Sequence, residues 1–223
     1  MIKVIELFAG IGAFRAALER LNIDHEVVAI SEIDKYAIQS YNAMYGDTPN
    51  LGDISKIDRL PKCDLLTYGF PCQDISVAGN MKGINEDTRS GLLFQVERLL
   101  DTADIFDELP DYLIMENVKN LVGKKFKADF DRWLEKLESL GYVNHWKVLN
   151  TADYGIPQHR ERVFCISIKK SLGQGFEFPK PQELDIYLKD CLEDEVDEKY
   201  FLSDKYLQHA MENHEKMKQA NND

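Results

Sequence analysis

The sequence predicts an α/β fold built on a mostly parallel, doubly wound sheet that includes one antiparallel strand. Short apolar runs typical of buried strands alternate with segments whose apolar residues recur at helical spacing. The linker between the last two runs is broken by Gly155 and Pro157 and is too short for a crossover helix, so those strands should be antiparallel. The length of 223 residues suits one domain, or one domain with an appendage.

Six apolar runs are predicted to be strands, and one more short strand is predicted just before Gly52. The six runs are residues 2–8, 26–30, 64–68, 112–115, 143–149 and 163–168. Between them, three helices are predicted from apolar residues that share one face. These faces consist of Ile11, Phe14, Ala17, Leu18 and Leu21; of Leu92, Val96, Leu99 and Leu100; and of Phe126, Phe130, Trp133, Leu134, Leu137 and Leu140.

The composition is that of an ordinary globular protein, with 44% hydrophobic and 30% charged residues, which excludes fibrous and low-complexity classes. The net charge of −12 argues against holding nucleic acid by bulk electrostatics, so any such role must be local. Residues 171–223 carry 13 acidic and 6 basic residues. We therefore expect a domain over residues 1–170 and an acidic extension over 171–223. In that extension, Ser203 should cap a helix whose apolar residues face inward, namely Tyr206, Leu207, Ala210 and Met211.

The four cysteines, Cys63, Cys72, Cys165 and Cys191, are widely spaced and form no CxxC pair. This spacing indicates free thiols rather than a disulfide framework or a zinc site, and we expect no metal. The apolar start of the chain lacks a signal-peptide cleavage region, and no stretch reaches the length of a membrane span. We therefore expect a cytoplasmic protein with no membrane contact.

The first two predicted strands end in residues typical of a nucleotide site, and ligands of open α/β sheets bind at this edge. The turn from Phe8 to Gly12 would let backbone amides approach a ligand, although a tight turn without a ligand explains it equally well. Arg15 stands where a dinucleotide fingerprint has its third glycine, which disfavours a pyrophosphate. Glu32 lies about 20 residues further on, where an acid typically binds ribose, and Asp53 offers a second acid. Together they suggest a cofactor that contains a nucleoside.

Three later segments add reactive groups at the same edge. Most free cysteines are inert, but Cys72 follows Pro71 and precedes polar residues, and a thiolate there could act as a nucleophile. Glu116 follows the run 112–115, and partial burial would let it donate a proton, unless it only bonds the local backbone. Arg160 and Arg162 precede the final strand and could hold a carbonyl oxygen or an anion, although arginines there are usually solvated.

Read in order, these segments resemble the DNA cytosine-5 methyltransferase family over residues 2 to about 170. The matching segments are ELFAGIGAF (6–14), SEID (31–34), GDIS (52–55), GFPCQDIS (69–76), MENV (115–118) and YGIPQHRERVF (154–164). The resemblance implies a Rossmann-like fold of the S-adenosylmethionine-dependent methyltransferases.

The resemblance also implies S-adenosylmethionine as cofactor, with S-adenosylhomocysteine as product. Glu32 would bind the ribose, Ile33, Asp53 and Ile54 the adenine, and Leu92 would line the pocket. The full set of cofactor-binding residues implied is Phe8, Ala9, Gly10, Ile11, Gly12, Glu32, Ile33, Asp53, Ile54, Gly69, Pro71 and Leu92.

In the implied reaction, Cys72 adds to ring carbon 6 of cytosine and carbon 5 then takes the methyl group. Glu116 would protonate or hydrogen-bond ring nitrogen 3, Arg162 would hold the oxygen at ring position 2, and Arg160 would help to position the site. The target base must leave the duplex to reach the thiol. Residues 75–90 are similar to the family's loop that closes over the flipped base.

Complete family members continue into a target-recognition domain and two further motifs, which are not found after Asn213. The resemblance therefore implies either the N-terminal piece of a longer enzyme, natural or engineered, or one half of a split enzyme. Its partners would be double-stranded DNA and a second chain carrying the remaining parts, in a bacterial or phage-encoded system.

Three alternatives remain open at this point. A related enzyme could methylate cytosine in transfer RNA, although the residues from Asp74 to Ser76 are closer to the DNA enzymes. The chain could also be a non-catalytic fragment that only binds cofactor. A cysteine hydrolase is disfavoured, because His159 is the only histidine predicted at this edge of the sheet.

Overall fold

The structure, a computed structural model, describes residues 1–71 and 89–220. It divides into two compact units, Met1–Leu184 and Asp185–Asp223. Within the described ranges, no helix is both long enough and apolar enough to cross a lipid bilayer.

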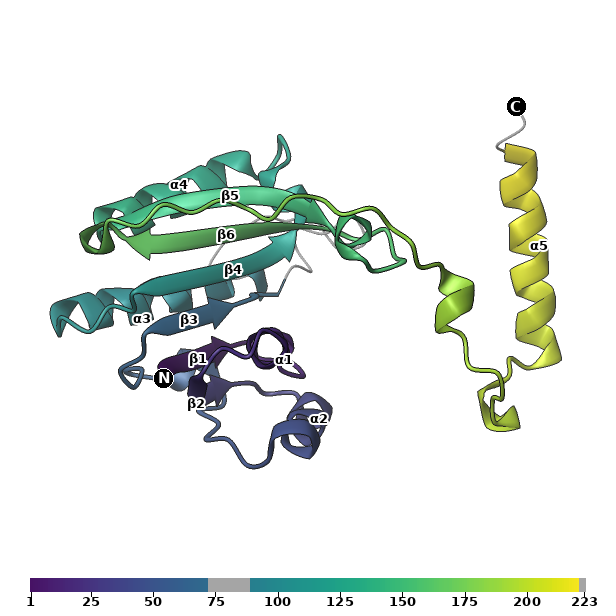
Figure 1. Cartoon of the computed structure of the whole chain (residues 1–223), viewed down its shortest axis with the longest axis horizontal. Helices are drawn as coiled ribbons and strands as arrows, with labels where there is room; N and C mark the ends of the chain where they lie inside the picture. The colour runs from purple at the N-terminus through teal and green to yellow at the C-terminus, as the bar shows by residue number, and fades with distance from the viewer. Residues whose placement is uncertain (72–88, 221–223) are drawn as a thin grey trace. The chain divides into compact units, whose positions relative to one another are not determined.

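The first unit is organised around one six-stranded sheet with the order β2-β1-β3-β4-β6-β5 (Figure 1). Strands β1 to β4 pair in parallel, and β6 runs antiparallel to both of its neighbours, β4 and β5. The predicted fold is therefore confirmed, including its single antiparallel strand. The strand bounds are Ile2–Leu7 (β1), His25–Ser31 (β2), Leu65–Tyr68 (β3), Tyr112–Val118 (β4), Tyr142–Asn150 (β5) and Glu161–Lys169 (β6).

The prediction of a further short strand before Gly52 is wrong. Asn50 forms only an isolated bridge with Ile30, and the chain then turns into a 3₁₀ helix, Ile54–Lys56 (η1). The turn follows from local chemistry, because the Asp53 carboxylate accepts the backbone N–H of Ser55 and caps this helix. Such a side-chain bond competes with a strand ladder.

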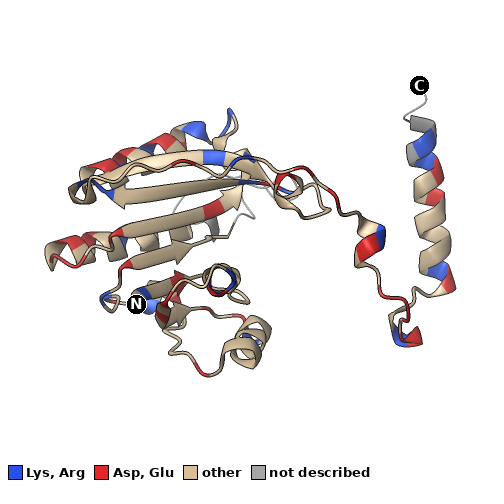
Figure 2. Cartoon of the chain, in the orientation of Figure 1, with Lys and Arg blue, Asp and Glu red and all other residues tan. Residues whose placement is uncertain are grey.

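Helices cover both faces of the sheet. Helices α1 (Ala13–Arg20) and α2 (Lys35–Tyr45) lie on one face, and α3 (Leu93–Ile105) and α4 (Lys127–Ser139) lie on the other (Figure 1). Alternate residues of the central strands supply two apolar clusters, one against each helix pair. Acidic and basic residues are interleaved on the outside of α4 (Figure 2). The predicted stripe of α1 is only partly covered, since Ile11 and Leu21 are exposed.

A buried carboxylate joins β1 to α1 and α2. Glu6 is 1% exposed, and its Oε1 accepts the N–H of Arg15 at 3.1 Å while its Oε2 accepts the hydroxyl of Tyr41 at 2.6 Å. The N-cap of α1 is Gly12, which has no side chain, so Glu6 supplies the acceptor that a capping side chain would provide. Burial raises the pKa of Glu6, although these hydrogen bonds and Arg15 oppose the shift.

The segment after β6 remains part of the first unit up to Leu184. Tyr154 donates its hydroxyl to the carbonyl of Pro179 at 3.0 Å, and the Gln182 N–H donates to Asp153 at 2.8 Å. This segment therefore packs beside the 3₁₀ helix Thr151–Tyr154 (η4) that follows β5.

The second unit contains two short 3₁₀ helices and α5 (Asp204–Ala220), which begins directly after Ser203. The expectation that the apolar residues of this helix face inward is wrong for the described structure. Tyr206, Leu207 and Met211 are all exposed. Among the described residues of this unit, the other helices are short 3₁₀ turns that do not cover that face.

Replacing Gly12 by alanine should destabilise the fold more than the same change at Gly173. Both glycines have left-handed backbone, which costs alanine about 1–2 kcal/mol. At Gly12 a Cβ atom would also lie 2.6 Å from Tyr45 Cε2 and 2.7 Å from Tyr41 Cε2, whereas at Gly173 it would meet nothing within 4 Å. We expect Gly12→Ala to cost a further ~1–3 kcal/mol, from overpacking. Equal losses in free energy of unfolding, measured in urea, would contradict this packing argument.

Candidate active site

A cavity of about 280 Å³ opens at the carboxyl ends of β1, β2 and β3, and we call it the β2-side cavity. Eight of the twelve predicted cofactor residues line it, together with Ser31 and Gly52. Those eight are Phe8, Glu32, Ile33, Asp53, Ile54, Gly69, Pro71 and Leu92. The fold therefore brings to one place residues that the family resemblance implied from separate motifs.

The other four predicted cofactor residues belong to the glycine turn. Ala9 lines a neighbouring cavity instead, and Gly10 reaches the β2-side cavity through a hydrogen bond to Glu32. Ile11 is exposed and Gly12 packs against tyrosine rings of α2, and neither lines the cavity. These two positions shape the turn rather than the cavity wall.

Glu32 ties the end of β2 to the glycine turn. Its Oε2 accepts the Gly10 N–H at 2.8 Å, and its Oε1 accepts the N–H groups of Ile33 and Asp34, both at 2.8 Å. A carboxylate offers about four acceptor positions. Three are used by backbone, so the carboxylate keeps one position for a hydroxyl of a ligand.

The lining of the β2-side cavity suits a nucleoside. Ile33, Ile54, Pro71 and Leu92 supply apolar surface for a base. The carboxylates of Glu32 and Asp53 can accept hydrogen bonds from hydroxyl or amino groups. None of its described lining residues is Lys or Arg, so this part of the wall offers no side-chain cation for a pyrophosphate.

A second cavity of about 640 Å³, the β6-side cavity, lies between α1, β4, β6 and η4. Its polar wall holds Glu116, Arg160 and Arg162, all three predicted as catalytic from the sequence. Phe8 and Gly69 line both cavities, so the two meet at these residues. The remaining lining residues are Ala9, Ala13, Phe14, Ala17, Leu149, Asn150, Thr151, Tyr154, Ile156, Phe164 and Pro179.

Glu116 and Arg162 form an ion pair across neighbouring strands. Arg162 Nε lies 3.0 Å from Glu116 Oε1, with the two side chains 22% and 30% exposed. In the register of β4 and β6, Arg162 pairs with Val118 and Glu116 pairs with Phe164, so the two are diagonal neighbours on one face. The sequence had placed both residues just outside their strands, whereas the structure places both inside.

The protonation of Glu116 reflects two opposing effects. Burial raises its pKa, and the charges of Arg162 and Arg160, with the Arg162 hydrogen bond, lower it. Burial is the larger effect, so the pKa lies above the ordinary value for glutamate. A carboxyl group of this kind can exchange a proton with a ligand nearer to neutral pH than an exposed one.

The turn between β5 and β6 orients Arg160 toward this cavity. Asn150 Oδ1 accepts the N–H groups of Ala152 at 3.3 Å and of Arg160 at 3.0 Å. The Thr151 N–H donates to the Arg160 carbonyl at 3.1 Å, and the Thr151 hydroxyl donates to Gln158 at 2.5 Å. This turn therefore holds the backbone of Arg160 on both sides.

Asn117 holds the segment that follows β3. It is buried, its Nδ2 donates to the Phe70 carbonyl at 3.0 Å, and its Oδ1 accepts the Val118 N–H at 2.9 Å. Phe70 and Pro71 are thereby tied to β4 beside Glu116.

The predicted nucleophile Cys72 lies outside the described residues, as do residues 75–88 of the predicted closing loop. The 3₁₀ helix Arg89–Leu92 (η2) brings Leu92 to the β2-side cavity.

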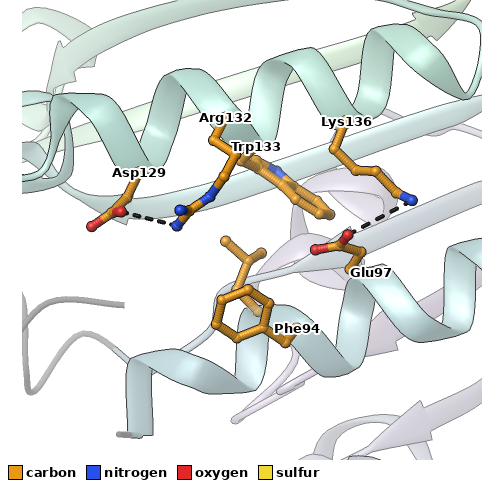
Figure 3. Close-up of a pocket in the computed structure, with 7 residues that line it drawn as sticks. Phe94, Glu97, Asp129, Arg132, Trp133 and Lys136 are labelled. Atoms are coloured by element: carbon orange, nitrogen blue, oxygen red, sulfur yellow. Dashed lines mark hydrogen bonds and ion pairs between the residues drawn. The ribbon is translucent and has the colours of Figure 1, made fainter. Parts of the chain in front are cut away.

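Another hollow, of about 330 Å³, lies between α3 and α4 on the opposite face of the sheet (Figure 3). Trp133 and Phe94 contribute its apolar part. Its charged groups are paired, with Arg132 at 2.9 Å from Asp129 and Lys136 at 3.7 Å from Glu97. None of its described lining residues is a predicted site residue.

Sequence reasoning missed several residues that shape the site. Asn50 and Asn150 each accept the backbone N–H of a predicted site residue, and Asn117 donates to the backbone of Phe70, which lies between two of them. An asparagine at the end of a strand is a signal for such a turn, and Asn150 fits it. Asn50 and Asn117 bond across to other segments, which no local pattern reveals.

Comparison with known proteins supports the sequence resemblance. The C-5 cytosine-specific DNA methylase family matches residues 2–223. The Type II methyltransferase M2.ScrFI of Lactococcus lactis subsp. cremoris is 39% identical over 91% of this chain and 70% of its own length. M.DsaV of Dactylococcopsis salina is 40% identical over 98% of the chain and 60% of its own length. M.HhaI of Haemophilus parahaemolyticus is 40% identical, over 86% and 57% respectively.

The chain thus spans between 57% and 70% of the length of these three relatives. Among solved structures, a DNMT2 from Spodoptera frugiperda superimposes with a TM-score of 0.74 at 24% identity, over 95% of this chain and 65% of that one. This likeness supports the fold. From the family match and the three relatives together, the chain belongs to the C-5 cytosine-specific DNA methylase family.

Proposed function

We propose that the chain provides the catalytic part of an enzyme that transfers a methyl group from S-adenosylmethionine to carbon 5 of cytosine in DNA. The observation that carries this proposal is the meeting of two cavities at Phe8 and Gly69. One cavity has the lining of a nucleoside site, and the other has a carboxyl group and two arginines. A group-transfer reaction needs its donor and acceptor side by side in this way.

In this proposal the β2-side cavity holds the cofactor. Glu32 accepts a ribose hydroxyl with its remaining acceptor position, and Asp53 receives hydrogen bonds from the adenine amino group. Ile33, Ile54 and Leu92 contact the adenine ring. When bound, S-adenosylmethionine supplies the activated methyl group.

The β6-side cavity receives the flipped cytosine. The thiolate of Cys72, which follows Pro71 in the sequence, adds to ring carbon 6 and makes carbon 5 nucleophilic. Glu116 shares a proton with ring nitrogen 3, so it neutralises the negative charge that develops on addition. Arg162 donates to the carbonyl oxygen at ring position 2, and Arg160 supports the same edge. After methyl transfer, loss of the proton on carbon 5 releases the thiolate.

Double-stranded DNA is the substrate we propose. The net charge of −12 makes general attraction to phosphate weak, so the arginines at the cavity must act locally. Base contacts that select a target sequence would come from a further domain or from a second chain.

Covalent trapping tests the proposed nucleophile. We expect DNA in which 5-fluorocytosine replaces every cytosine to form a denaturation-resistant adduct with the protein when S-adenosylmethionine is present, because fluorine cannot leave as a proton does. Denaturing gel electrophoresis detects the adduct. The matched control is Cys72→Ala, which should form none. A missing adduct even after the segments that complete members carry are added, or one that survives Cys72→Ala, would sink the proposed mechanism.

The pKa of Glu116 tests the role of its arginine partner. Because Arg162 lowers this pKa, Arg162→Gln should raise it further, whereas Arg132→Gln on the opposite face should leave it unchanged. Carboxyl ¹³C chemical shifts followed through a pH titration measure both. An unchanged Glu116 pKa in Arg162→Gln would contradict the ion pair.

The raised pKa of Glu116 also has a consequence for stability. The stabilisation of the folded state that comes from this raised pKa is fully present below the unfolded pKa of about 4.5, and it is lost as the pH rises through the higher folded value. As the pH rises across that interval, the free energy of unfolding of the unchanged protein should therefore fall relative to that of Glu116→Gln, which has no carboxyl group to titrate at this position.

Transfer of labelled methyl groups separates DNA from transfer RNA as the substrate. With both nucleic acids in one reaction, we expect label mainly in DNA. The matching family is that of C-5 cytosine-specific DNA methylases, and two of the relatives are Type II methyltransferases. Label mainly in transfer RNA would support the RNA alternative instead. Cofactor binding with no label in either, even after the segments that complete members carry are added, would favour a non-catalytic role.

A further inference from the structure

The amide side chain of Asn50 holds both walls of the β2-side cavity. Its Oδ1 accepts the N–H of Glu32 at 3.1 Å and the N–H of Gly52 at 2.9 Å. Its Nδ2 donates to the carbonyl of Glu32 at 3.0 Å. One side chain thus hydrogen-bonds both backbone polar groups of Glu32 and also the turn that leads to Asp53.

The surrounding backbone places Asn50 for this task. The Ile30 N–H donates to Pro49 and the Leu51 N–H donates to Ile30, both at 2.8 Å, so this stretch lies along the end of β2. Ser31 adds a hydrogen bond from its hydroxyl to the carbonyl of Gly52 at 2.7 Å. These bonds set the approach of the two segments, whereas the Asn50 amide fixes the orientation of the Glu32 peptide.

Orientation matters because the Glu32 carboxylate has little freedom left. It accepts three backbone N–H groups, including that of Gly10 in the glycine turn, and keeps about one acceptor position for a ligand. A small rotation of the Glu32 backbone would turn that position away from a bound hydroxyl.

We propose that Asn50 is a positioning residue for cofactor recognition, which acts by orienting Glu32 toward the ribose hydroxyls of the bound nucleoside. This inference rests on the proposed function, because it takes Glu32 as the residue that binds the ribose. It assigns a role to a residue outside every motif that the sequence singled out.

Asn50 is exposed, so the backbone groups released by its removal can bond to water and the fold should persist. Its loss should therefore appear in ligand binding and not in global stability. Asn50→Ala removes all three hydrogen bonds. Asn50→Asp keeps an acceptor for the two N–H groups but loses the donor to the Glu32 carbonyl.

The experiment is isothermal titration calorimetry of the full chain with two probes. One is S-adenosylhomocysteine, and the other is its analogue that lacks the 2′ and 3′ ribose hydroxyls. We expect Asn50→Ala to weaken S-adenosylhomocysteine about tenfold, as the loss of one or two hydrogen bonds predicts. The dideoxy analogue should change by less than about twofold, because it makes no bond to Glu32. Asn50→Asp should show the same preference to a smaller degree.

The matched control is Thr48→Ala, which removes a hydrogen bond from Arg15 to the same loop at 3.1 Å without touching Glu32 or Gly52. It should leave both affinities unchanged, and thermal melting of each free variant should match that of the parent chain. Equal weakening of both probes, or a fall in melting temperature that accounts for the loss, would make Asn50 merely structural and overturn the inference. Unchanged binding of both probes would also overturn it.

A parent chain that binds neither probe would overturn the proposed cofactor and this inference together. A parent chain that binds S-adenosylhomocysteine, with Asn50→Ala equal to it, would overturn only the inference.

Discussion

The antiparallel pairing of β6 with β4 determines the chemistry of the site. Side chains alternate along β6, so Arg162 and Phe164 face the α1 side while Val163 and Cys165 are buried on the α4 side. A slip of one residue would bury the arginine among apolar side chains and leave Glu116 without its partner. The turn held by Asn150 and Thr151 therefore sets the register of β6, and with it the face of the sheet on which the Arg162 guanidinium lies.

The same face of the sheet holds two carboxylates with raised pKa values, and their surroundings separate their roles. Glu6 is closed in by the Tyr41 hydroxyl and the Arg15 N–H, so it serves packing at the start of α1. Glu116 faces a cavity and an arginine, so its proton is open to a ligand. A raised pKa alone would not distinguish them, because burial produces both shifts.

The sequence was sufficient for the succession of strands and helices along the chain and for the edge where the motifs gather, because apolar periodicity and strand ends are local signals. It placed Glu116 and Arg162 outside their strands, since polar residues interrupt an apolar run even where the ladder continues. It also predicted a strand near Gly52, where the Asp53 cap produces a 3₁₀ turn. Asn50 and Asn117 escaped notice because their hydrogen-bond partners are distant in sequence or specified only by the fold.

The two cavities share a wall formed by two residues of very different size, Phe8 and Gly69. Phe8 has a positive φ of 56°, which is unusual for an aromatic residue and is a strain typical of functional sites. A Cβ atom at Gly69 would lie 3.4 Å from Glu116 Oε2, in van der Waals contact with that carboxylate. In the proposed reaction the methyl group must pass this wall. Because Gly69 has no side chain, it leaves room for that transfer where the two cavities meet.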